Sequence, residues 1–71
     1  MDYRILGRTG LSVSVIGLGT EYLFRAGWDV VASVIGEAAD AGVNFIDLLG
    51  AEPGYRDNFG AALRGRRDRF V

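Results

Sequence analysis

The sequence predicts an α/β fold, because short apolar segments typical of strands alternate with segments of helical periodicity. Residues 43–47 form a short apolar run that ends in a carboxylate, and we expect a strand there, buried on both faces. Residues 29–41 and 55–63 each place apolar side chains at helical spacing. Strands that alternate with helices form right-handed crossover units and a parallel sheet. We therefore expect one α/β unit over residues 1–71.

The first twenty residues predict a β-hairpin and a third strand. Residues 3–6 are typical of a strand, residues 7–10 of a turn, and residues 11–14 alternate strictly between apolar and polar side chains. We therefore expect a hairpin over residues 3–14 with one face in water. Residues 15–20 form an apolar run that ends in glycines, which predicts a buried strand leading into a loop over residues 21–27.

Two helices are expected in the rest of the chain. Asp29 offers an N-cap for the first, and Gly42 offers the usual C′ residue at its end. A loop over residues 48–54 precedes the second helix, which we expect to start near Tyr55 or Arg56. One face of that helix would carry Tyr55, Phe59, Ala62 and Leu63. After a polar connector at residues 66–69, Phe70 and Val71 are typical of the start of another strand, so we expect a fragment of a larger fold.

Composition excludes several classes of function. The chain has 71 residues, a formal net charge of -1, 49% hydrophobic and 24% charged residues, which argues against disorder and against binding nucleic acid by charge alone. Without cysteine or histidine, disulfides and the usual zinc sites are excluded, and we expect no metal. No apolar run is long enough to cross a membrane and no signal peptide is evident, so the cytoplasm is the default expectation. A chain this small, with unpaired sheet edges, is expected to self-associate.

The candidate site residues follow two of the predicted strands. A carboxylate at the end of an apolar strand needs solvent or a cation, so Asp47 either belongs to a site or simply caps a turn. Gly17-Leu18-Gly19 lacks the third glycine of a dinucleotide fingerprint, because Tyr22 occupies that position. These glycines, with the hydroxyl of Thr20, either bring the backbone close to a ligand or form a tight bend. The nearby aromatic residues either line a pocket or pack in the core: Tyr22, Phe24 and Trp28.

The chain resembles the aldo-keto reductases over nearly its whole length. The similarity is carried by residues 3–11, Val13-Ser14, Gly17-Leu18-Gly19-Thr20, residues 41–47 and residues 59–68. This resemblance implies a (β/α)₈ TIM barrel in which an N-terminal hairpin closes the barrel floor. Residues 1–71 would then supply the hairpin 3–14, the first two βα units and the start of the third strand. It also implies reduction of aldehydes or ketones, as small-molecule carbonyl substrates, with NADPH or NADH.

The resemblance also implies roles for single residues. In the family a tyrosine protonates the carbonyl oxygen, while an aspartate and a lysine tune it. The aspartate matches Asp47, as a catalytic and cofactor-binding residue, and the pair near the nicotinamide matches Gly19 and Thr20. The tyrosine is expected five residues after the aspartate, where this chain has Glu52, so the usual proton donor is missing.

The family's lysine and its phosphate-binding loops would lie beyond Val71, so we expect the 71-residue chain alone to be inactive. One alternative is a non-catalytic descendant of the barrel that acts as an interaction or regulatory module. Another is a self-standing small α/β binding domain.

Overall fold

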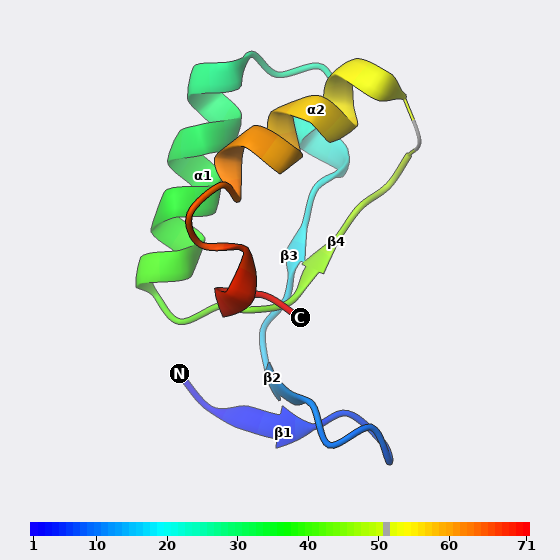
Figure 1. Cartoon of the computed structure of the whole chain (residues 1–71), viewed down its shortest axis with the longest axis vertical. Helices are drawn as coiled ribbons and strands as arrows, with labels where there is room; N and C mark the ends of the chain where they lie inside the picture. The colour runs from blue at the N-terminus through cyan, green and yellow to red at the C-terminus, as the bar shows by residue number, and fades with distance from the viewer. Residues whose placement is uncertain (51) are drawn as a thin grey trace.

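Two helices cover one face of a short parallel sheet, and a β-hairpin extends from the opposite end of the molecule (Figure 1). The structure is a computed structural model that describes residues 1–50 and 52–71. The elements in this part of the chain are β1 (Tyr3–Ile5), β2 (Ser12–Ser14), β3 (Leu18–Gly19), the 3-10 helix η1 (Glu21–Leu23), α1 (Trp28–Asp40), β4 (Ile46–Asp47), α2 (Pro53–Ala62) and the 3-10 helix η2 (Arg67–Arg69). The protein is therefore a small mixed α/β fold. Of the loop predicted at residues 48–54, position 51 lies outside the described residues.

The predicted hairpin is confirmed. β1 and β2 pair antiparallel, with Arg4 opposite Val13. The predicted alternation of exposed and buried residues fails at Ser14, which is buried beside Val13. Ser14 is satisfied there by polar partners: its amide donates to Asn44 Oδ1 at 2.7 Å, and its hydroxyl donates to the carbonyl oxygen of Ile16 at 2.6 Å. Asn44 Nδ2 also donates to the carbonyl oxygen of Ser12, so Asn44 fastens the hairpin to the segment that leads into β4.

The predicted parallel pairing is also confirmed, since β3 and β4 pair in parallel and α1 lies between them in the sequence. The strands are much shorter than predicted. β3 contains only two of residues 15–20, and the side chains of Val15 and Ile16 are exposed.

Burial of the 43–47 strand on both faces is wrong for this structure. Leu18 and Ile46 pack against the core that the helices form. On the other face of the sheet, Phe45 is 39% exposed and Leu49 is 61% exposed. Within residues 1–50 and 52–71 the helices cover one face only, so alternate side chains of β4 and its flanks meet solvent (Figure 1).

Helix α1 ends as predicted but starts earlier. Gly42 has φ +89° and donates its amide hydrogen to Ala39, while Val43 donates to Ala38; this is a Schellman motif. The N-cap, however, is Gly27 and not Asp29. Asp29 lies in the first turn, where its negative charge is favoured by the helix dipole without a side-chain cap.

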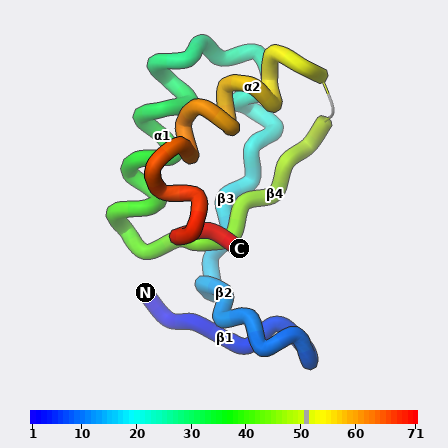
Figure 2. The backbone as a smooth tube through the Cα atoms, in the orientation of Figure 1, coloured from blue at the N-terminus to red at the C-terminus, as the bar shows by residue number. Residues whose placement is uncertain are grey.

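Helix α2 completes the core. It starts at Pro53, before the predicted Tyr55, because proline fits the first turn of a helix, where its missing N–H has no partner to lose. Its predicted apolar face is confirmed, with Tyr55, Phe59 and Ala62 buried against α1. The core cluster consists of Leu23, Val31, Ile35, Ala39, Tyr55, Phe59, Ala62 and Phe70. After η2 the chain turns back toward the start of β4 (Figure 2).

Candidate functional site

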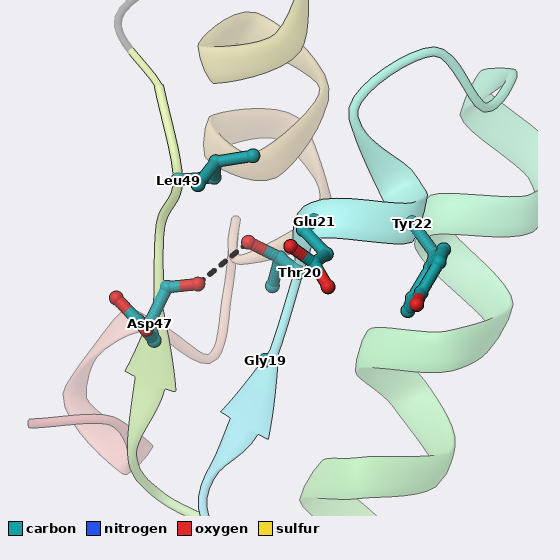
Figure 3. A pocket seen from close by; sticks show the side chains of 6 residues that line it. All are labelled: Gly19, Thr20, Glu21, Tyr22, Asp47 and Leu49. Atoms are coloured by element: carbon teal, nitrogen blue, oxygen red, sulfur yellow. Dashed lines mark hydrogen bonds between the residues drawn. The ribbon is translucent and has the colours of Figure 1, made fainter.

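A hollow of about 310 Å³ lies at the carboxyl ends of the two parallel strands (Figure 3). It is lined by Gly19, Thr20, Glu21, Tyr22, Asp47 and Leu49. The three residues singled out in the sequence, Gly19, Thr20 and Asp47, thus lie together. The Thr20 hydroxyl donates a hydrogen bond of 2.6 Å to the backbone carbonyl of Asp47. This is the edge of a parallel sheet at which α/β proteins commonly bind ligands.

The hollow exists because the two strands separate at this point. The last paired residues of the sheet are Gly19 and Asp47. After them the backbone that follows β3 enters η1, and the backbone that follows β4 enters the segment before α2. A Cβ atom at Gly19 would meet no other atom within 4 Å, so open space lies directly over the strand end. Of the two predicted alternatives, an exposed backbone fits Gly19, whereas Gly17 is closely packed: a Cβ atom there would lie 3.0 Å from the ring of Phe45.

A pair of buried hydroxyl groups joins Thr20, which lines the hollow, to Tyr55 of α2. Thr20 is 1% exposed and Tyr55 is 4% exposed, and their hydroxyl groups are hydrogen-bonded to each other. The hydroxyl of Tyr55 also accepts a hydrogen bond of 2.9 Å from the amide of Leu49. Residues from three parts of the chain therefore meet through two side-chain oxygens.

The predicted aromatic residues divide between the two predicted roles. Phe24 packs edge-on against Tyr55, with ring centroids 5.6 Å apart, and so belongs to the packing around the core. Tyr22 lines the hollow and is 91% exposed. Trp28, at the start of α1, is half-exposed and is not among the lining residues.

The charges at the hollow are negative. Asp47 and Glu21 both line it, and in the part of the chain that the structure describes no arginine is among its lining residues. A site with two carboxylates and no cation favours neutral or positively charged ligand groups and disfavours phosphate. Within residues 1–50 and 52–71, no group of three acidic or histidine side chains is arranged to hold a metal ion.

Glu52 lies outside this hollow. It is exposed, directly precedes α2, and its carbonyl oxygen accepts a hydrogen bond from the amide of Arg56. The position where the resemblance leads us to expect a tyrosine is thus the N-cap of a helix and not part of the wall formed by Asp47 and Thr20.

Sequence reasoning missed Tyr55 as a residue of the site. Its spacing to Phe59 indicated the apolar face of a helix, and both residues are indeed core residues. One property of a tyrosine on the apolar face of a helix can be recognised from the sequence: its hydroxyl group needs a hydrogen-bond partner when it is buried. The identity of that partner depends on how α2 crosses the strand ends, which local spacing does not specify.

Comparison of the chain with models of protein families, with curated proteins and with solved structures finds no match. In the part of the chain that the structure describes, none of the helices has the length and apolar character needed to cross a membrane.

Proposed function

We propose that residues 1–71 form the N-terminal part of an aldo-keto reductase-like (β/α)₈ barrel that reduces aldehydes or ketones with NADPH or NADH. The observation that supports this best is the meeting of Gly19, Thr20 and Asp47 around one hollow at the carboxyl ends of parallel strands. These are the residues to which the resemblance assigns contact with the nicotinamide and tuning of the proton donor. In barrels of this class the site lies at that end of the strands.

The hollow suits the nicotinamide end of the cofactor and not its phosphates. Its volume of about 310 Å³ is at the lower limit of the range, roughly 300–1,000 Å³, that is usual for ligand pockets. The open space over Gly19 allows a flat ring to approach the backbone, and the two carboxylates favour a positively charged ring over an anion. A grip on the phosphates would have to come from elsewhere in the whole protein.

In this proposal Asp47, Gly19 and Thr20 each have a defined task. The bound nicotinamide would supply hydride to the carbonyl carbon of the substrate, and the proton for the carbonyl oxygen would have to come from elsewhere in the whole protein, since Glu52 lies outside the hollow. Asp47 would hold a positively charged partner at the strand end, and Gly19 would leave room for the ring. Thr20 would keep the two strand ends at a fixed separation through its hydrogen bond to the Asp47 carbonyl.

The test uses the protein expressed from its whole reading frame. NADPH oxidation is followed with a panel of aldehydes and ketones, for the natural sequence and for Asp47→Asn. The matched control is Asp57→Asn, which removes a charge from the exposed side of α2, away from the lining residues. We expect turnover that falls at least about a hundredfold in Asp47→Asn and is unchanged in the control. Absence of turnover with every carbonyl, or equal turnover in all three proteins, would overturn the proposal.

The second candidate function is a non-catalytic interaction or regulatory module built on the same scaffold. Two observations favour it. Glu52 occupies the position of the expected proton donor and lies outside the hollow, and the phenol of Tyr55 is enclosed in the core. A protein of this kind would retain its fold in Asp47→Asn and show no carbonyl reduction at any pH.

A further inference from the structure

The hydrogen bonds around Tyr55 have only one consistent direction. The carbonyl oxygen of Asp47 can only accept, so the single hydroxyl proton of Thr20 is donated to it. Thr20 then has no proton left for Tyr55, and the phenol must be the donor in the bond between them. The amide of Leu49 donates to the same phenol oxygen. The chain of donors therefore runs from the Leu49 amide through Tyr55 and Thr20 to the Asp47 carbonyl.

This chain of hydrogen bonds begins where the sheet stops. The last backbone pair of the sheet joins Gly19 to Asp47, and no strand pairing is present beyond it in the described residues. Thr20, the next residue after Gly19, and Leu49, the second residue after Asp47, are joined instead through two side-chain oxygens. Four of the six residues that line the hollow belong to the segments held in this way: Gly19, Thr20, Asp47 and Leu49.

We propose that Tyr55 is the positioning residue of the hollow: its phenol ties Thr20, at the end of β3, to Leu49 in the segment after β4, and together with the bond from Thr20 to the Asp47 carbonyl this sets the distance between the walls. The phenol reaches this place because its ring is held edge-on between Phe24 and Phe59, with centroid distances of 5.6 Å and 5.1 Å. Tyr55 is 4% exposed, and its proton is engaged with Thr20. Tyr55 is accordingly a positioning residue and not the donor of a proton to a ligand.

The inference deepens the proposed function, because it concerns the walls of the same hollow, but its test needs no cofactor and no turnover. The key variant is Tyr55→Phe, which keeps the ring between Phe24 and Phe59 and removes only the hydroxyl. The matched control is Tyr3→Phe, which removes a tyrosine hydroxyl that donates to the Gly42 carbonyl at the other end of the molecule. Thr20→Ser keeps the hydroxyl of the chain of hydrogen bonds, and Thr20→Val removes it with little change of shape.

The measurement is hydrogen exchange of single backbone amides, followed by NMR on the protein expressed from its whole reading frame, because the 71-residue chain by itself is expected to self-associate. In Tyr55→Phe we expect the Leu49 amide to exchange at least about tenfold faster, because it loses its partly buried acceptor. The Val31 amide of α1 donates to the carbonyl oxygen of the N-cap residue Gly27. Its exchange rate serves as the internal reference for the stability of the fold. Chemical shifts of Gly19 and Asp47 should move in the same variant and stay constant in Tyr3→Phe.

The threonine variants show whether Thr20 acts on the Leu49 amide through its hydroxyl group or through the packing of its methyl group. We expect Thr20→Val to speed exchange at Leu49 and Thr20→Ser to restore the natural rate, although serine lacks the buried methyl group. In the double variant Tyr55→Phe with Thr20→Val, exchange at Leu49 should be no faster than in Tyr55→Phe alone. Thr20 acts on Leu49 only through the Tyr55 hydroxyl, so its substitution has no further effect once that hydroxyl is removed.

Three results would overturn the inference. They are an unchanged Leu49 rate in Tyr55→Phe, a change at Leu49 that merely follows the change at Val31, and equal effects of Thr20→Ser and Thr20→Val. Each of these three results is independent of the proposed function, which is tested separately by NADPH oxidation.

Discussion

The amide of Val71 donates a hydrogen bond of 2.7 Å to the carbonyl oxygen of Asn44, two residues before β4. Phe70 has an extended backbone and is buried, so the end of the chain is held against the segment that leads into β4. No strand is present at Phe70 and Val71 in this structure, so the strand start predicted there stays a prediction. Next to it, a second hollow of about 150 Å³ lies between β4 and α2 and is lined mostly by apolar residues: Ile46, Leu48, Phe59, Leu63, Arg67, Phe70 and Val71.

We predict that the 71-residue chain by itself is not a stable monomer. Its accessible surface of 4929 Å² exceeds the roughly 4,300 Å² expected for a folded monomer of 7.7 kDa. Large apolar side chains such as Leu49 and Phe45 remain exposed on the open face of the sheet. Sedimentation velocity at several concentrations should show self-association, and circular dichroism should show no cooperative melting of a monomer at low concentration.

A variant pair localises this self-association. Leu49→Ser, on the open side of the sheet, should weaken it, whereas Val30→Ser, an exposed position of α1, should leave it unchanged. A monodisperse monomer with a cooperative thermal transition would contradict the prediction.

Gly42 gives a prediction about stability. Its φ of +89° is unfavourable for any other residue, and a Cβ atom there would lie 2.8 Å from the hydroxyl oxygen of Tyr3. Gly42→Ala should therefore destabilise the fold by about 1–3 kcal/mol and break the hydrogen bond from Tyr3 to the Gly42 carbonyl. Gly60→Ala is the control, since α2 has open space there and alanine should stabilise the helix by about 0.5–1 kcal/mol. Urea unfolding of the protein expressed from its whole reading frame, at equal protein concentrations, measures both; a neutral Gly42→Ala would refute the argument.

The parts of the fold that the sequence predicted well are those set by local chemistry. Gly42 ends α1 because glycine adopts positive φ without strain, and the apolar face of α2 follows from the spacing of Tyr55 and Phe59. Prediction failed for the start of α1, where Asp29 and Gly27 are both acceptable caps and the choice depends on how the preceding loop packs.

Burial and the wall of the hollow depend on distant parts of the chain. The pattern at residues 43–47 suits a strand that is buried on both faces. Burial of the second face needs another element packed against it, which the local pattern does not provide, and Phe45 is left exposed. Gly19, Thr20 and Asp47 could be grouped in advance because parallel strands present their carboxyl ends at one edge. The hydrogen bond between Tyr55 and Thr20 joins residues 35 positions apart in the sequence, so it could not be predicted from local spacing. The same holds for Asn44, whose three hydrogen bonds to the hairpin strand β2 span 30 or more residues.

We predict that the isolated chain catalyses no carbonyl reduction. The hollow offers two carboxylates and no cation among its lining residues, so nothing there would hold the phosphates of NADPH. NADPH oxidation with a broad panel of aldehydes should stay at the buffer rate. Turnover above that rate, abolished by Asp47→Asn, would show that the 71 residues suffice.

In the protein expressed from its whole reading frame, we predict that Asp47→Ala impairs both stability and activity. If the proposed function is right, Asp47 pairs with a lysine on the next strand, and its removal leaves that cation unpaired near the core. Removing one partner of a buried pair typically costs about 3–5 kcal/mol. Thermal unfolding and NADPH oxidation should both respond. An active protein indifferent to Asp47→Ala would rule out the family's mechanism.

The last prediction concerns Glu52→Tyr in the same whole protein. A positioned general acid typically raises a rate by about 10²–10⁴-fold, so a phenol returned to the catalytic position should have a large effect. Glu52, however, is exposed at the N-cap of α2 and is not among the residues that line the hollow with Asp47 and Thr20. We therefore expect Glu52→Tyr to change carbonyl reduction by no more than a few-fold. Glu52→Gln, which removes the charge without adding a phenol, controls for electrostatics. A gain of a hundredfold or more in Glu52→Tyr alone would show that position 52 reaches the substrate.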